Sequence, residues 1–190
     1  MEQQDWASAT SRTIAAEVRR HRQARGMSAQ ALADRCAELG ITSLPRSVIA
    51  NLENGRRGNV TFAEVLVLAA ALDVPPVVLA FPVGYAATVE YLPGESAPPL
   101  DARDWFDGTG RDDDSALALL LQHRQLEQRI RGHYRRIWDT AETGEPDGPE
   151  AQAAREVAEE LTAQLREVRT EIRARGLVLP PSAGLDVDGD

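Results

Sequence analysis

The sequence has little that would support redox chemistry or a metal site. Its 190 residues include one cysteine, Cys36, so no disulfide can form within the chain and no metal site can be built from several cysteines. The three histidines, His21, His123 and His133, are scattered and lack the spacing of a ligand cluster. We therefore expect no metal, no cofactor and a reducing, cytoplasmic location.

Long apolar runs are also missing. No stretch approaches the roughly 18 apolar residues that a membrane span needs, and the polar start MEQQDWASATSR lacks the pattern of a signal peptide, so we expect no membrane association. The sequence shows no nucleophile paired with histidine, no phosphate-binding glycine loop and no carboxylate pair, which argues against an enzyme. Aromatic residues make up only 5% of the chain, so the core must be aliphatic.

Lysine is absent, and all 21 basic residues are arginine. The formal net charge of -9 would by itself argue against a nucleic-acid partner, but the charge is unevenly distributed. Residues 11–60 carry nine arginines against four acids, whereas residues 61–114 carry two arginines against ten acids. The first segment is therefore basic enough to contact phosphates, and the second is acidic.

Periodicity predicts an all-α fold that begins with five short helices in residues 11–82. These helices are expected over residues 10–25, 29–39, 46–54, 62–74 and 77–82. Ser28 and Thr61 are good N-caps for the second and fourth helices. Pro45 is suited to the first turn of the third helix, and Gly55 closes that helix.

The remainder of the chain is expected to contain a linker and two tails. Residues 83–114 read as an acidic linker in which residues 87–94 form a short extended, β-like element, and the Trp-Phe pair at 105–106 anchors to a neighbouring surface. Residues 1–10 are expected to be a disordered N-terminal tail, and residues 177–190 a frayed acidic tail.

Residues 115–176 predict an antiparallel helical hairpin with a coiled-coil-like apolar stripe. The stripe consists of Leu119, Leu126, Ile130, Ile137, Val157, Leu161, Leu165, Val168 and Ile172. Because two helices alone hide such stripes poorly, we expect the hairpin to dimerise or to bind a partner. The alternatives are a solvated spacer, or a pocket for an effector or partner protein formed by Tyr134, Trp138 and Trp105.

Four runs in residues 11–82 occur together: VRRHRQARGMS, ALADR, SVIANLENGRRG and EVLVLAAALDVPPVVLAF. With these runs, the segment resembles the lambda-repressor-like, or XRE-type, helix-turn-helix domain of regulators from high-GC bacteria. The resemblance implies a transcription regulator, such as a repressor, that binds double-stranded DNA in a sequence-specific manner as a homodimer.

The resemblance also implies a role for individual residues, with the helix over 46–54 lying in the major groove. The implied base contacts are Arg46, Ser47, Ala50 and Asn51, and the implied phosphate contacts are Ser28, Gln30, Arg56 and Arg57. Arg22 and Glu53 are implied to form a structural ion pair. The chemistry is suitable, because a guanidinium fits the guanine O6/N7 edge and a carboxamide fits the adenine N6/N7 edge.

Two departures from the family pattern affect the expected docking. The segment CAELGITSLP makes the second helix or the following turn longer than in compact members, and Ala29 stands where many members have glutamine. The competing interpretation is a five-helix bundle that binds only protein. In that case the chain would be an interaction adaptor or an antitoxin-like partner that uses its helical hairpin.

Overall fold

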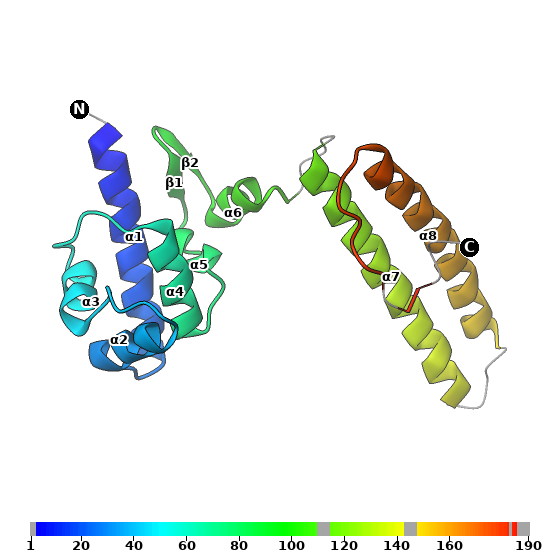
Figure 1. The fold of residues 1–190 in the computed structure, drawn as a ribbon, viewed down its shortest axis with the longest axis horizontal. Helices are drawn as coiled ribbons and strands as arrows, with labels where there is room; N and C mark the ends of the chain where they lie inside the picture. Colours follow the sequence, from blue (N-terminus) through cyan, green and yellow to red (C-terminus); the bar gives the residue numbers. More distant parts are fainter. Residues whose placement is uncertain (1–2, 110–114, 143–147, 183, 186–190) are drawn as a thin grey trace. The chain divides into compact units, whose positions relative to one another are not determined.

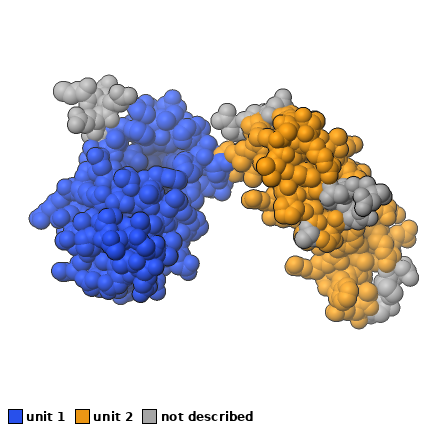
Figure 2. All heavy atoms as spheres, viewed as in Figure 1, with its two compact units in different colours: residues 1–107 blue, residues 108–190 orange. Residues whose placement is uncertain are grey.

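The computed structural model describes residues 3–109, 115–142, 148–182 and 184–185. The chain divides into two compact units, residues 1–107 and residues 108–190 (Figure 2). The described residues are mostly helical, with one small antiparallel sheet in the first unit and a helix pair in the second (Figure 1). The predicted fold class is therefore confirmed.

The first unit begins with the five expected helices. They are α1 (Gln3–Ala24), α2 (Ala29–Glu38), α3 (Arg46–Glu53), α4 (Phe62–Leu72) and α5 (Val77–Ala80). Helix α1 contacts α3, α4 and α5, and α2 contacts α3 and α4. The buried cluster between them is aliphatic, as expected, and includes Val18, Leu32, Ile49, Leu52 and Leu68, each fully buried.

Local capping signals explain two of the helix starts. The Ser28 hydroxyl accepts a hydrogen bond from the Ala31 amide at 3.1 Å, at the start of α2. Thr61 and Glu64 form a reciprocal capping box at the start of α4. Gly55 follows α3 with a φ of +69°, a left-handed conformation that favours glycine and that ends the helix.

The prediction of a disordered tail over residues 1–10 is wrong for the described part of that segment, because α1 begins at Gln3. Tertiary contacts extend the helix: the Trp6 indole Nε1 lies 3.4 Å from the Glu90 carbonyl oxygen, and α1 contacts the strand that contains Glu90. Residues 1–2 lie outside the described residues.

The segment predicted as a linker is largely part of the first unit. It contains the expected extended element as strand β1 (Val89–Leu92), paired antiparallel with β2 (Glu95–Ala97), and an additional helix α6 (Pro99–Asp107). The rings of Phe106 and Phe81 meet edge to face at 5.6 Å, and those of Trp105 and Tyr91 lie 5.0 Å apart. Residues 110–114 of the expected linker lie outside the described residues.

The second unit is the predicted hairpin, made of α7 (Ala116–Glu142) and α8 (Pro149–Ala174). Most of the predicted stripe is buried between these two helices of one chain. The buried members are Leu126, Ile130, Leu161, Leu165, Val168 and Ile172, while Leu119 and Ile137 are half-buried and Val157 is 36% exposed. The six buried members are therefore the core of the hairpin and offer no free surface for a second copy.

The C-terminal segment does not fray over its described residues. Leu177, Leu179 and Leu185 pack against the hairpin core and cover it, which explains how two helices hide the stripe. Arg169, only 2% exposed, donates hydrogen bonds to the Pro180 carbonyl oxygen at 3.0 Å and to the Ser182 hydroxyl at 2.7 Å. Residues 186–190 lie outside the described residues.

Across the ranges described above, none of the helices is both long enough and apolar enough to cross a membrane.

Because Leu165 lies in the hairpin core, Leu165→Ala should destabilise the second unit by about 2–5 kcal/mol, since the truncation removes apolar packing and leaves a cavity. Leu117→Ala is the matched control, since Leu117 is 50% exposed on α7, and it should change stability by no more than about 0.5 kcal/mol. Urea unfolding followed by circular dichroism measures both. Equal effects of the two substitutions would contradict this assignment of the core.

Candidate nucleic-acid interface

The start of α2 presents two of the predicted phosphate contacts. Ser28 is exposed even though its hydroxyl caps the helix, and Gln30 is exposed with its Nε2 donating to Asp34 Oδ1 at 2.8 Å. Both residues lie where backbone N–H groups and the helix dipole favour an anion. The structure thus places them at the surface, on a helix end of suitable polarity.

Of the segment CAELGITSLP, residues 36–38 belong to α2 and residues 39–45 form the turn before α3. Helix α2 ends at Glu38, and Gly40 follows with a φ of +89°. Leu44, only 1% exposed, then anchors the turn in the core, and Pro45 directly precedes α3. The start of α3 is therefore held by apolar burial at Leu44, in spite of the longer connection.

Helix α3 has one buried face and one exposed polar face. Ile49 and Leu52 are completely buried and attach the helix to the core. Three of the predicted base contacts, Arg46, Ser47 and Asn51, are exposed, and Ala50 is half-buried. Because residues four apart lie on the same side of a helix, Ser47 and Asn51 share one face.

Two shallow hollows flank this polar face. One lies between α2 and α3, and its lining includes Gln30, Asp34 and Arg46. The other is lined by Ser43, Val48, Asn51, Arg56 and Arg57. The lining of the second hollow includes Arg56, which has no carboxylate partner among the described residues, so the hollow suits a phosphate or the acceptor edge of a base.

An ion pair joins α1 to the C-terminal end of α3. Arg22 Nε donates to Glu53 Oε1 at 2.6 Å, and Arg22 Nη2 donates to Glu53 Oε2 at 2.6 Å. Arg22 Nη1 also donates to the Met27 carbonyl oxygen at 2.6 Å. The two side chains are 14% and 6% exposed, and the hydrogen bond to Glu53 raises the pKa of Arg22. This bidentate geometry fixes the orientation of α3 on α1.

Arg57 has a structural partner that sequence reasoning missed. Its Nη2 lies 2.7 Å from Glu64 Oε1, so the capping box of α4 also binds the arginine. Burial would raise the pKa of Glu64, but hydrogen bonds from Thr61 and Arg57 outweigh it and lower that pKa. In the sequence, the Thr61-x-x-Glu64 capping pattern is the feature that indicates a fixed carboxylate close to Arg57. Arg56, by contrast, is exposed, and it lines the second hollow together with Arg57.

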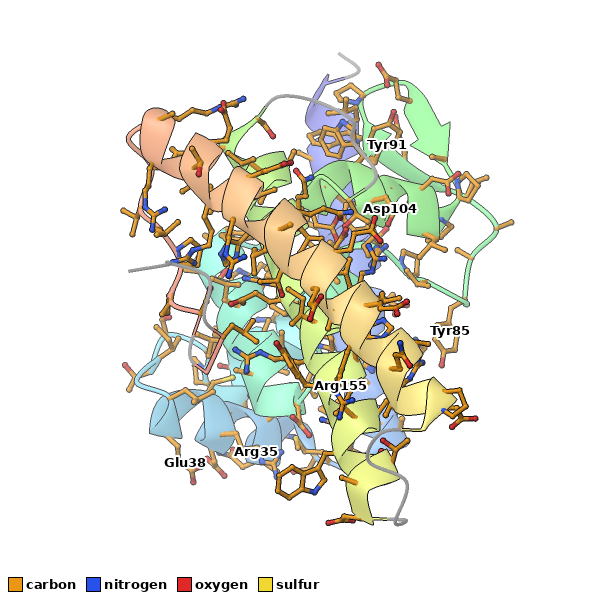
Figure 3. All side chains as sticks on the ribbon, turned by 90° about the vertical axis from the view of Figure 1, so that its right-hand side faces the viewer. Arg35, Glu38, Tyr85, Tyr91, Asp104 and Arg155 are labelled. Atoms are coloured by element: carbon orange, nitrogen blue, oxygen red, sulfur yellow. The ribbon has the colours of Figure 1, made fainter. Side chains whose placement is uncertain are left out.

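Several other arginines of the basic segment bind the protein itself. Arg20 forms an ion pair with Glu17 and lies over the ring of Tyr85, 3.4 Å from its centroid. Arg25 donates to the Asp73 carbonyl oxygen, and Arg35 to that of Ala71. Arg35 and Glu38 both project from the surface of α2 (Figure 3). The local charge of this segment therefore overstates the number of arginines that are free for phosphates.

The three aromatic residues predicted for an effector pocket belong to different units. Trp105 lies in the first unit against Tyr91, whereas Tyr134 and Trp138 lie on α7, where they are 51% and 68% exposed. Among the described residues no group of three His, Cys, Asp or Glu side chains could hold a metal ion. Cys36 is buried, and burial raises the pKa of its thiol.

Comparison with known proteins agrees with this geometry. A family model described as a helix-turn-helix domain matches residues 13–81, which include most of α1 and all of α2 to α5. The chain matches no curated protein and no solved structure.

Removing the charge of Glu53 should destabilise the first unit. Glu53→Gln leaves Arg22 nearly buried and without its carboxylate, which costs about 3–5 kcal/mol for a buried pair. Glu38→Gln makes the same chemical change at an exposed site of α2 and should cost no more than about 0.5 kcal/mol. Urea unfolding of the two variants measures the difference, and similar midpoints would show that the ion pair does not stabilise α3.

Proposed function

We propose that this chain, whose residues 13–81 form a helix-turn-helix DNA-binding domain of the lambda-repressor-like kind, regulates transcription by reading the major groove with α3. One observation carries the proposal. Helix α3 is attached by Ile49 and Leu52, oriented by Glu53, and leaves Arg46 and Asn51 exposed. A rigid helix with an outward polar face is what base recognition requires.

The side chains of α3 suit the edges of bases in distinct ways. Arg46 can donate two hydrogen bonds to guanine O6 and N7, and Asn51 can pair with adenine N6 and N7. Ser47 can bind either purine or pyrimidine edges, and the half-buried Ala50 can contact a thymine methyl group. These four residues are therefore the proposed readers of sequence.

Phosphate contacts would hold α3 in register. Ser28 and Gln30 act at the start of α2, and Arg56 acts beyond Gly55. Arg57 is held by Glu64, which offsets its charge, so its proposed part is to shape the wall of the hollow in which Arg56 meets a phosphate. Such contacts supply affinity without sequence preference.

A homodimer is part of the proposal. One α3 offers few side chains to the bases, and pairing on half-sites about one helical turn apart doubles them. The interface must use surfaces other than Leu161 and Leu165, because those side chains are buried within one hairpin. A DNA partner also implies a cytoplasmic location.

The second candidate function is a protein-interaction adaptor or an antitoxin-like partner. The exposure of Tyr134 and Trp138 on α7 favours it, because exposed aromatic residues are frequent in protein interfaces. In that case α3 would have no base preference. The two candidates therefore differ in what a randomised DNA pool selects.

Selection of bound duplexes from a randomised pool, followed by fluorescence anisotropy at two salt concentrations, tests the proposal. Enrichment of a palindromic site with steep salt dependence supports a dimeric DNA reader. Absence of enrichment, with weak binding that salt abolishes, would instead support the adaptor.

On the selected duplex, Arg46→Ala and Arg56→Ala should behave differently. Arg46→Ala should relax base preference at one position by about 1–3 kcal/mol, because alanine cannot donate the bidentate pair of hydrogen bonds. Arg56→Ala should weaken all duplexes similarly and reduce the salt slope by about one. Arg175→Ala, at the end of α8 and paired with Glu171, is the control and should leave both unchanged. Wild-type binding by both α3-region variants would rule out this docking.

A further inference from the structure

Helix α7 carries a concentrated basic surface. Between residues 124 and 138 the sequence has five arginines and a single acid, Glu127. The arginines are Arg124, Arg129, Arg131, Arg135 and Arg136, and all five side chains are exposed. Because seven residues make about two helical turns and four make about one, Arg124, Arg131 and Arg135 lie on the same side of α7.

Most of these arginines form no ion pair among the described residues, although Asp139 lies one turn beyond Arg135 and lines a hollow together with Arg136 and Glu150. Arg124, Arg129, Arg135 and Arg136 form no ion pair within the ranges that the structure describes. In the first unit, by contrast, Arg20, Arg22 and Arg57 bind internal carboxylates. Like charges on one helix repel one another, and an anionic partner that binds Arg124, Arg129, Arg135 and Arg136 would relieve this repulsion.

We propose that the exposed arginine face of α7 is a second DNA-binding surface, which contacts the phosphate backbone of the duplex read by α3. The inference rests on the proposed function. The face offers guanidinium groups, which bind phosphate oxygens in a bidentate manner, and its contacts would be independent of sequence.

The dimensions of α7 suit this partner. The segment from Arg124 to Arg136 is about 18 Å long, and duplex DNA carries one phosphate charge per 1.7 Å or so of its axis. Residues 108–115 connect α6 to α7 and can span at most about 29 Å when fully extended. A duplex held by the first unit is therefore at a high effective concentration for α7, so even weak phosphate contacts add to the affinity.

Neither unit attracts DNA through its overall charge. Residues 1–107 carry ten arginines against thirteen acids, so the unit as a whole is negative. Beyond the Debye length of about 8 Å at physiological salt, such a unit does not attract DNA. Residues 108–190 carry eleven arginines against seventeen acids, so this unit is also negative as a whole, and the arginines of α7 attract phosphates only at short range, as α3 and its neighbours do.

A second copy of this chain is the competing occupant, because α8 presents exposed acids, among them Glu156, Glu160 and Glu167. The observations favour DNA. Arg124, Arg131 and Arg135 share one side of α7, as contact with a phosphate backbone requires, and the chain has a DNA-binding domain on the same polypeptide. The experiment distinguishes the two occupants.

The test compares two triple variants of the full chain. Arg124, Arg131 and Arg135 are changed to glutamine on α7, and the control changes Arg166 and Arg173 on α8 and Arg175 at its C-terminal cap, which removes the same charge. Both are titrated with the selected duplex and with a shuffled duplex of equal length over a series of salt concentrations. Circular dichroism and sedimentation without DNA report folding and mass.

The α7 variant should bind both duplexes more weakly by the same factor, about tenfold or more at low salt. Its salt slope should fall by about 0.9 for each phosphate that no longer has a guanidinium partner, up to roughly 2.7. The α8 control should bind like the wild type. This combination supports the inference.

An unchanged slope for the α7 variant, or an equal weakening in the α8 control, overturns the inference. A lower sedimentation mass of the α7 variant without DNA assigns the face to a second copy and also overturns it. Arg46→Ala reports separately on the proposed function, because it alters base preference and leaves general affinity for phosphates intact. Failure of α7 and failure of α3 as DNA-binding elements are thus distinguishable.

Discussion

The ion pair between Arg22 and Glu53 is the interaction on which the candidate interface depends. Apolar burial of Ile49 and Leu52 attaches α3 to the core, but apolar contacts are not directional and would tolerate rotation of a short helix. The bidentate guanidinium–carboxylate contact supplies the missing direction, and the additional bond from Arg22 to the Met27 carbonyl oxygen ties the start of α2 to the same point. Arg22 on α1 therefore fixes the positions of both α2 and α3.

The use of arginine divides into two classes. One class is structural and is satisfied by carboxylates or carbonyl oxygens of the same unit, as for Arg22 and Arg57. The other class is exposed and has no internal partner in the described residues, as for Arg46, Arg56 and Arg135. Net charge does not separate the classes, which is why a chain with a formal charge of -9 can still present basic surfaces. The contacts of each guanidinium decide its role.

Local signals made much of the first unit predictable, whereas contacts between distant residues did not. Ser28 and Thr61 cap helices with neighbours three residues away, so the sequence pattern contained the whole interaction. The start of α1 depends on Trp6 meeting Glu90, and α6 on Phe106 meeting Phe81, pairs that periodicity cannot reveal. The order of the C-terminal segment is likewise not predictable from local pattern, because its anchor is a buried arginine on α8.

Amide chemical-shift mapping by NMR on the full chain, titrated with its selected duplex, tests the central claim most directly. If α3, oriented from α1, reads DNA, the largest shift changes should fall at the start of α2, in the turn before α3, and in α3 up to Arg57. Changes confined to other segments, or no change in α3 at saturating duplex, would contradict the account. The measurement locates the contact surface without altering any side chain.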